Sequence, residues 1–274
     1  ISTMFPCTII FWCFYTNLQI IKSVYLKLEI EYLFLIMDEK LHFEKFISWT
    51  KKNTFSLENL FPTVHKNKAI HIDLSIQNNT VKTEEEFNNP KYFGEKLAEI
   101  QEQNSDKIIA GGYLEKRALY TSDIYNSENS NQKRNIHLGV DFWLPENTPI
   151  HALLDGEVIC AVHQTSYKGY GGFVILKHIG KEVEFYTLYG HLSKESISNF
   201  SLGEIIKQNE QIGVLGDYQE NGEWVPHLHF QIMLDVLDYQ NDFPGVALES
   251  ELEFWKMICP NPNLLFKLDS LSKI

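Results

Sequence analysis

Residues 173–189, FVILKHIGKEVEFYTLY, contain two short apolar stretches that flank a polar break at residues 180–182. Comparable stretches recur on both sides of it: Ile136–Trp143, Thr148–Val162, Glu204–Ile206, Gln211–Leu215 and His227–Leu234. Short apolar segments separated by turn residues are typical of antiparallel sheets and barrels. We therefore predict a mainly β domain over residues 131–240, with a compact antiparallel β-sheet or barrel-like sandwich. Within it, Asp155-Gly156 predicts the two-residue turn of a hairpin.

The regions on either side of this domain carry helical patterns as well. Residues 37–130 contain helix-like spacing at 37–53 and after Asn88-Asn89-Pro90, and strand-like alternation at 69–76 and 107–113. These patterns predict a smaller α/β N-terminal region, which we expect to cap a groove of the β domain. The polar stretch 122–135 marks its boundary, and residues 241–274 are expected to form a closing helix and a tail.

The composition excludes several classes of protein. The 274 residues include 24 Lys and Arg against 36 Asp and Glu, which gives a net charge of −12. Such an acidic chain is not expected to hold nucleic acid through its phosphates. The four cysteines (Cys7, Cys13, Cys160 and Cys259) form no CxxC pair, so neither a disulfide scaffold nor a cysteine zinc site is predicted. A cationic partner or a neutral peptide fits this composition better, and the sequence does not indicate an oligomeric state.

The first residues leave the cellular location open. Residues 5–21 carry no charge, but the nearest basic residues, Lys22 and Lys27, follow the apolar run instead of preceding it as in a secretory signal. We favour the interpretation that residues 1–36 lie upstream of the natural start at Met37, which predicts a cytoplasmic protein. One alternative is a membrane anchor at 5–21 that faces the domain toward the cell envelope. The other is a folded extension.

Histidines gather in the predicted β domain, where seven of the ten fall between residues 137 and 229. Three short motifs hold the candidates for chemistry: His137-Leu-Gly-Val-Asp141, Tyr189-Gly-His191-Leu-Ser193 and His227-Leu-His229. A second HxxxD pair, His151 and Asp155, is set aside because Asp155 is better explained as the turn residue before a glycine.

The spacing of these motifs suits a metal site. His227 and His229 are two apart on a predicted strand and so present their imidazoles on one face. His137 and Asp141 would lie about 13 Å apart in an extended chain, so the segment must bend, most easily at Gly139. Two histidines and one aspartate leave a coordination position open, as in catalytic zinc sites, although Fe(II) is a chemical alternative. Spacing alone does not tell which of His227 and His229 is the ligand.

The order of these motifs resembles the lysostaphin/LytM-type zinc metallopeptidases, over about residues 134–235. The intervening sequence agrees with that family at its turn residues and glycines: Pro149-Ile150, Asp155-Gly156-Glu157-Val158, Tyr170-Gly171-Gly172, Gln211-Ile212-Gly213, Gly216 and Pro226. The resemblance implies a compact antiparallel β fold and hydrolysis of cross-bridge or stem peptides of peptidoglycan.

By position, the resemblance also implies roles for five residues. His137, Asp141 and His229 correspond to the ligands of one zinc ion, and His191 and His227 to the catalytic pair. A zinc-activated water would then attack the scissile carbonyl while the two histidines move protons.

Two alternatives stay open. The domain is either an active zinc metalloendopeptidase or a catalytically silent module of the same fold that binds peptide or regulates a partner. All five positions are filled, which favours the enzyme. If the protein stays in the cytoplasm, its substrate is a peptide that does not belong to the cell wall.

Overall fold

The computed structural model describes residues 37–78, 83–120, 122–127 and 132–272. The chain divides into two compact units, Ile1–His42 and Phe43–Ile274, and the described part of the first unit is helical. The interpretations of residues 1–36, including the anchor at 5–21, lie outside the described residues. Within the described part of the chain, no helix has both the length and the apolar character needed to cross a membrane.

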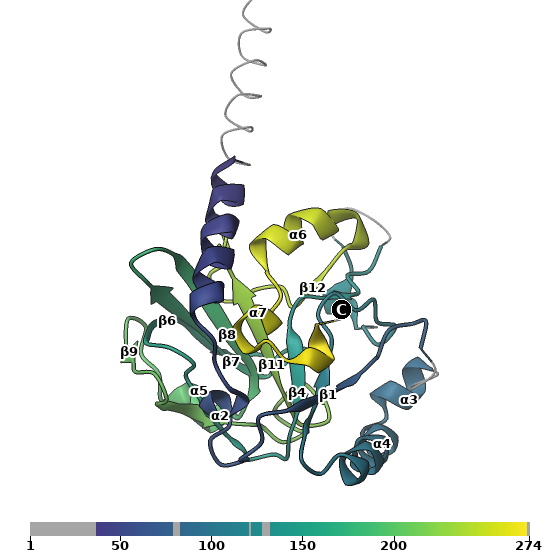
Figure 1. Cartoon of the computed structure of the whole chain (residues 1–274). Helices are drawn as coiled ribbons and strands as arrows, with labels where there is room; N and C mark the ends of the chain where they lie inside the picture. Colours follow the sequence, from purple (N-terminus) through teal and green to yellow (C-terminus); the bar gives the residue numbers. More distant parts are fainter. Residues whose placement is uncertain (1–36, 79–82, 121, 128–131, 273–274) are drawn as a thin grey trace, which may run out of the picture. The chain divides into compact units, whose positions relative to one another are not determined.

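An eight-stranded sheet forms the framework of the second unit (Figure 1). Its strands, in spatial order, are β1 (Ala69–Ile72), β2 (Ile108–Gly111), β4 (Val140–Trp143), β11 (His227–Met233), β8 (Glu184–Leu192), β7 (Gly172–Ile179), β6 (Gly156–His163) and β9 (Ile205–Ile206). Neighbours pair in antiparallel fashion except for the parallel pair β1–β2. Two small sheets join β10 (Gln211–Val214) to β5 (Pro149–His151) and β12 (Val246–Ala247) to β3 (Ile136–His137). The predicted mainly β fold is confirmed.

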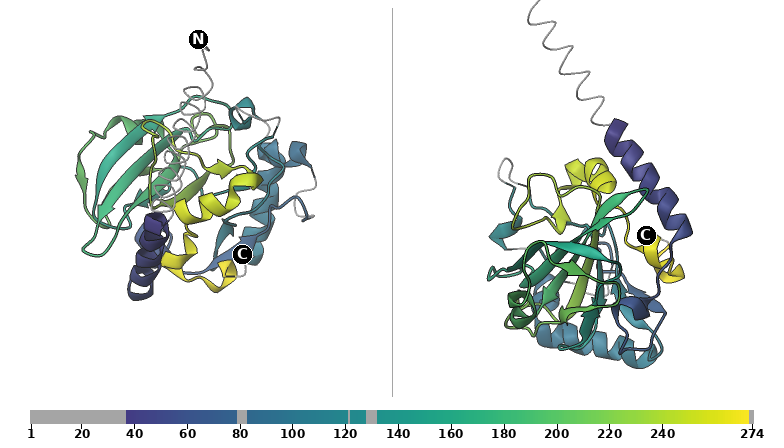
Figure 2. Two further views of the ribbon diagram at one scale, coloured as in Figure 1. Left: turned by 90° about the horizontal axis from the view of Figure 1, so that it is seen from above. Right: turned by 90° about the vertical axis from the view of Figure 1, so that its left-hand side faces the viewer.

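Within the described residues, most helices are short. They are residues 43–52, α2 (Leu57–Leu60), α3 (Glu84–Asn88), α4 (Pro90–Gln103), α5 (Lys194–Ser198), α6 (Leu252–Ile258) and α7 (Asn263–Phe266), with 3₁₀ turns η1 (Asp123–Tyr125), η2 (Glu249–Glu251) and η3 (Asp269–Leu271). Helix α4 begins where the sequence predicts, because the Asn89 side chain accepts from two backbone amides and Pro90 occupies the first turn. Figures 1 and 2 show α3 and α4 together beside the β1–β2 edge of the sheet.

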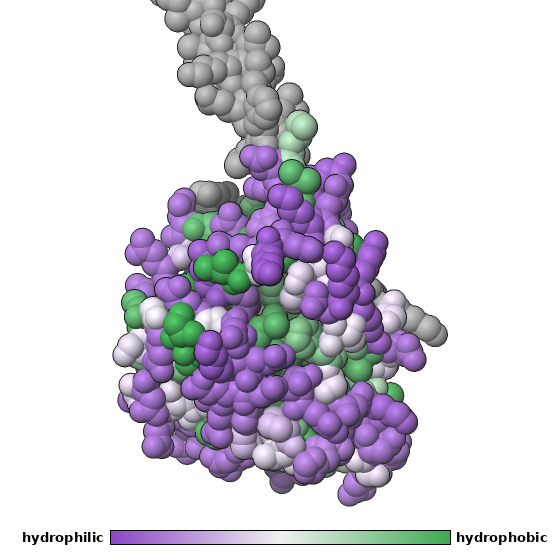
Figure 3. All heavy atoms as spheres, turned by 60° about the vertical axis from the view of Figure 1, so that its left-hand side comes forward, coloured by the Kyte–Doolittle hydropathy of each residue, from purple (hydrophilic) through white to green (hydrophobic). Residues whose placement is uncertain are grey.

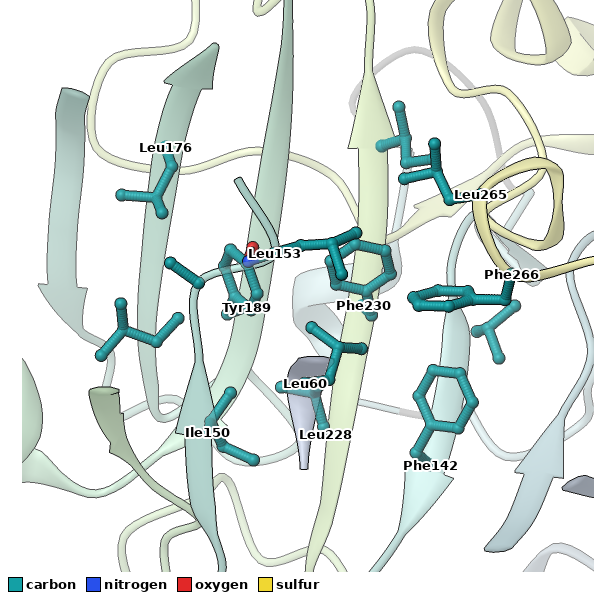
Figure 4. Packing of buried hydrophobic residues seen from close by; sticks show 14 of the residues in the cluster. Leu60, Phe142, Ile150, Leu153, Leu176, Tyr189, Leu228, Phe230, Leu265 and Phe266 are labelled. Atoms are coloured by element: carbon teal, nitrogen blue, oxygen red, sulfur yellow. Dashed lines mark hydrogen bonds between the residues drawn. The ribbon is translucent and has the colours of Figure 1, made fainter. Parts of the chain in front are cut away.

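Strand alternation gives the sheet one continuous apolar face. Successive side chains of a strand point to opposite faces, so Phe142 of β4 and Leu228 and Phe230 of β11 share one side. The ring of Phe266 in α7 packs against Phe142 and Phe230 at centroid distances of 6.0 and 5.6 Å, as Figure 4 shows. This cluster anchors the central strands and fixes their register.

The opposite face of the same strands carries polar residues. Asp141 of β4 and His227, His229 and Gln231 of β11 alternate with the apolar residues and are buried. Two further apolar clusters flank them, one built on α3 and α4 and the other on α6. Buried polar side chains between two apolar clusters are unusual enough to mark a functional site.

One local prediction is wrong. Asp155-Gly156 does not form the turn of a hairpin, because β5 ends at His151 and pairs with β10, while β6 pairs with β7 and β9. The Asp155 carboxylate instead accepts from the Gln208 amide at 2.7 Å and from Lys207 Nζ at 3.1 Å. The Asp155 side chain therefore stabilises the turn at residues 207–208.

The N-terminal region shares the sheet of the β domain. Strand β2 pairs with β4, so that Gly111 lies opposite Asp141, and β1 extends the sheet further. The domain boundaries at residues 131 and 240 stay predictions. On the face shown in Figure 3, hydrophilic side chains surround small groups of hydrophobic ones, as is usual for the surface of a globular domain.

Candidate metal centre and active site

Three potential ligand atoms meet on the polar face of the sheet. His137 Nε2 lies 3.0 Å from His229 Nδ1, and each of these nitrogens lies 3.2 Å from Asp141 Oδ1. A tetrahedral zinc ion with bonds of about 2.0–2.2 Å separates its ligand atoms by roughly 3.3–3.6 Å. The triangle is therefore close to the size that one small divalent ion requires.

The backbone brings the three residues together in the way the sequence predicts. In the β4–β11 pairing Asp141 lies directly opposite His229, which joins two of them across one ladder. His137 ends β3, and a bend at Leu138-Gly139 returns the chain to β4 so that the third side chain points to the same place. A Cβ on Gly139 would lie 2.7 Å from two ring atoms of His229, so only glycine fits at this bend.

Hydrogen bonds fix the orientation of both candidate imidazole ligands. His137 Nδ1 lies 2.9 Å from the carbonyl oxygen of Gly112, which can only accept, so this nitrogen donates. His229 Nε2 donates in the same way to Gln231 Oε1 at 2.9 Å. In their neutral forms the other two nitrogens carry lone pairs and face Asp141 Oδ1. These three acceptor atoms lie 3.0–3.2 Å from one another with no proton between them, so their lone pairs repel. A cation bound between them would remove that repulsion.

Asp141 is held ionised. Burial opposes its charge, but His137 and Arg117 outweigh that effect and keep the pKa of the carboxyl well below its usual range. Arg117 Nη1 donates to Oδ2 at 2.6 Å, which leaves Oδ1 directed toward the two imidazoles.

The remaining two predicted histidines lie beside this triangle. The rings of His191 and His227 are 4.2 Å apart, and His227 Nε2 is 3.8 Å from Asp141 Oδ1. Each ring donates Nδ1–H to a carbonyl, that of Asn221 for His191 at 2.9 Å and that of Val225 for His227 at 2.7 Å. Both histidines therefore present Nε2 as an acceptor. The five predicted site residues converge in one place; their roles remain predictions.

Burial keeps these imidazoles neutral. It lowers the pKa of His227 to about 4, and it holds the pKa of His191 well below the usual value with help from the neighbouring His227. The pKa of His137 is lowered too, by burial and by the charge of Arg117. Neutral imidazole is the form that binds a metal ion or accepts a proton from water.

A cavity of about 390 Å³ opens onto all five residues. Part of its wall comes from outside the predicted β domain, namely Phe87, Pro90, Phe93, Leu119, Tyr120, Ile124 and Tyr125. Two tryptophans border the histidines directly: Trp143 stacks on His227 at 5.7 Å, and Trp224 lies 6.3 Å from His191. A partly apolar cavity of this size with convergent polar groups is typical of a small-molecule or peptide-binding site.

Sequence reasoning missed several neighbours of the site. Gln231 shares the strand parity of His227 and His229, and this spacing could have identified it. Arg117 follows a buried strand as part of the charged sequence Glu-Lys-Arg, which is a weaker signal. For Tyr170 the sequence allows either an aromatic residue that lines a substrate groove or an ordinary packing residue, and it favours packing. In the structure the ring of Tyr170 lies 5.3 Å from the ring of His229. The rejected His151 bonds the Asn209 carbonyl instead.

Comparisons with known proteins identify a peptidase family over the part of the chain that carries the site. The family model described as Peptidase family M23 matches residues 135–241. A protein of Haemophilus influenzae named as an uncharacterized metalloprotease is 34% identical over 99 residues, 36% of this chain and 19% of that protein. Glycyl-glycine endopeptidase ALE-1 of Staphylococcus capitis is 34% identical over 120 residues, 44% of this chain and 29% of that protein.

Among solved structures, the catalytic domain of lysostaphin from Staphylococcus simulans is 28% identical, with a TM-score of 0.31 over 48% of this chain and 86% of that domain. The chain spans less than a third of the length of the curated relatives named above. The family match covers the strands that carry all five histidine and aspartate residues of the site. Residues 135–241 of this chain thus form a peptidase family M23 domain of the lysostaphin/LytM type.

Proposed function

We propose that the chain is a zinc-dependent metalloendopeptidase that cleaves peptide bonds in the cross-bridges or stem peptides of peptidoglycan. His137, Asp141 and His229 hold one zinc ion in this proposal, and His191 and His227 are the catalytic pair. The observation that carries it is the triangle of three acceptor atoms at 3.0–3.2 Å, with two further neutral imidazoles beside it.

The residues of the chain divide the chemistry between them. Bound at the triangle, zinc would supply a Lewis acid that lowers the pKa of a water molecule and polarises the scissile carbonyl. Nε2 of His191 and of His227 are free to accept a proton from the attacking water and to return it to the leaving amine. The carbonyls of Asn221 and Val225 keep these two rings oriented while the proton moves.

The environment of the site supports hydrolysis of a peptide. Trp143, Trp224 and Tyr170 surround the histidines, so a bound peptide would displace water from the reacting groups. The relative ALE-1 is named for action on glycyl-glycine bonds, and this supports a glycine-rich peptide, such as a glycine-containing cross-bridge, as substrate. A cell-wall substrate would place the domain toward the envelope, whereas a cytoplasmic location would require another peptide.

Digestion assays separate the enzyme from a silent peptide-binding module. The full chain is incubated with purified peptidoglycan and with glycine-rich and stem-type peptides, with and without a chelator, and products are identified by mass spectrometry. The proposal predicts cleavage that the chelator abolishes and added Zn²⁺ restores. Binding of these substrates without cleavage by zinc-loaded, folded protein would instead support the silent module.

A further inference from the structure

A buried ion-pair chain reaches the centre from outside the family-matched region. Arg117 Nη1 donates to Asp141 Oδ2 at 2.6 Å, and Arg117 Nε donates to Glu115 Oε2 at 2.9 Å. Glu115 Oε1 in turn lies 3.0 Å from Nε2 of His71 in β1. Arg117 is 2% exposed and Glu115 is 6% exposed. Burying two opposite charges this deeply costs free energy unless each charge is well paired. The linked ion pairs of Arg117 are therefore part of how the fold is stabilised.

The fold makes room for this pair at the end of β2. A Cβ on Gly111 would lie 3.0 Å from Arg117 Nη2, and a Cβ on Gly112 would lie 2.7 Å from Glu115 Oε1. The two consecutive glycines therefore leave the space that both side chains fill. Gly112 has a second function, because its carbonyl accepts from His137 Nδ1.

Gly112 and Arg117 thus bond two of the three candidate ligands, although both residues precede the matched domain. Asp141 has two equivalent oxygens, and a free carboxylate can rotate or offer both to a metal ion. A guanidinium bound to Oδ2 removes that freedom and leaves Oδ1 as the one oxygen in the triangle. Glu115 balances the positive charge that Arg117 would otherwise place next to a cation.

We propose that Glu115 and Arg117 are positioning residues of the metal centre: Arg117 fixes Asp141 as a ligand through Oδ1 alone, and Glu115 holds Arg117 in place. This inference rests on the proposed function, since it needs a metal ion at the triangle. It adds that the domain over 135–241 depends on the preceding segment for a preorganised site. Partners that orient metal ligands typically contribute about 10- to 100-fold in metal affinity.

The test is the Zn²⁺ dissociation constant of the full chain, measured by competition with a chromophoric chelator. Arg117→Met is expected to weaken Zn²⁺ binding about 10- to 100-fold. Arg117→Lys should recover part of the loss, because an ammonium can still bond Oδ2, and Glu115→Gln should give a smaller loss. Lys116→Met is the matched control: it removes one positive charge at the next residue, where the side chain pairs with the exposed Glu249. It should leave the dissociation constant unchanged.

A spectroscopic measurement separates positioning from general destabilisation. The visible absorption of Co²⁺ bound to the full chain reports its coordination, and Arg117→Met should change the bands while circular dichroism stays that of the wild type. If Arg117→Met does not fold, Arg117→Lys and Glu115→Gln decide in the same two assays. Wild-type Zn²⁺ affinity and Co²⁺ bands in the folded variants would overturn the inference and leave the proposed function standing. A wild-type chain that binds neither ion would instead overturn the proposed function itself.

Discussion

Gly139, in the bend between β3 and β4, lies directly against the imidazole of His229 in β11. A Cβ at this position would lie 2.7 Å from two ring atoms, closer than real contacts allow, and 2.8 Å from the carbonyl oxygen of Phe230. The bend that brings His137 to Asp141 and the placement of His229 therefore both depend on the absence of a side chain at Gly139. A ligand triangle built this way has little room for adjustment.

Gly139→Ala should accordingly weaken metal binding, because the added methyl group must displace the His229 ring or the β11 backbone. We expect a loss of at least about tenfold in Zn²⁺ affinity. Overpacking should also lower the free energy of unfolding by about 1–3 kcal/mol. Gly94→Ala in α4 is the matched control, since nothing lies within 4 Å of the added Cβ. Equal Zn²⁺ affinity in both variants would show that the close approach of Gly139 to His229 is not needed.

His137→Ala should remove the metal ion altogether from dialysed protein. The substitution deletes one of three converging acceptors and leaves a two-ligand site, which holds zinc much more weakly. Elemental analysis of the purified variant is expected to show well below about 0.1 zinc per chain. A variant that retains stoichiometric zinc would exclude His137 as a ligand.

His191→Asn should keep the metal and lose turnover. Asparagine suits the left-handed backbone at this position, where φ is +66°, but it cannot accept and return a proton as imidazole does. We expect kcat to fall by about 10²–10⁴-fold with unchanged zinc content. His151→Ala, which removes a histidine from the rejected HxxxD pair, serves as the control. Native turnover in His191→Asn would contradict the assigned role.

His178 links stability to pH away from the metal centre. Burial lowers its pKa to about 4, and the neutral ring donates Nδ1–H to the Asp155 carbonyl and accepts from Thr187 Oγ1. Between pH 6.5 and 4 the unfolded chain binds a proton that the folded chain does not, so stability falls as the pH falls through that window. The full effect is about 3 kcal/mol, and it is absent above pH 6.5.

His178→Gln should remove this contribution, because an amide makes both hydrogen bonds without titrating. Urea unfolding with chelator present, at pH 7.5 and pH 4.5, should show a drop for the wild type that exceeds the drop for the variant by about 2–3 kcal/mol. Identical drops would mean that His178 is protonated normally in the folded protein.

Much of the fold could be predicted because its signals are local. Alternation located the central strands, the Asn89-Pro90 pair located the start of α4, and the length of an extended HxxxD segment required the bend at Gly139. The prediction of a hairpin at Asp155-Gly156 was wrong because strand pairing is not a local property. A turn dipeptide does not determine which strands pair, and Asp155 bonds a segment more than 50 residues away.

The site was predictable to the same extent. Histidine motifs identify the five residues, but spacing does not say which of His227 and His229 faces the triangle. In the structure, Asp141 lies directly opposite His229, and His229 Nδ1 is 3.2 Å from Asp141 Oδ1. Arg117 could not be found by periodicity, since it reaches Asp141 across 24 residues and belongs to no strand.

The metal content of the purified full chain shows whether the triangle of His137, Asp141 and His229 binds an ion. After incubation with Zn²⁺ and exhaustive dialysis, elemental analysis should find about one zinc ion per chain, bound by two imidazoles and one carboxylate. A correctly folded protein that emerges from this treatment without zinc would show that the triangle is not a metal site.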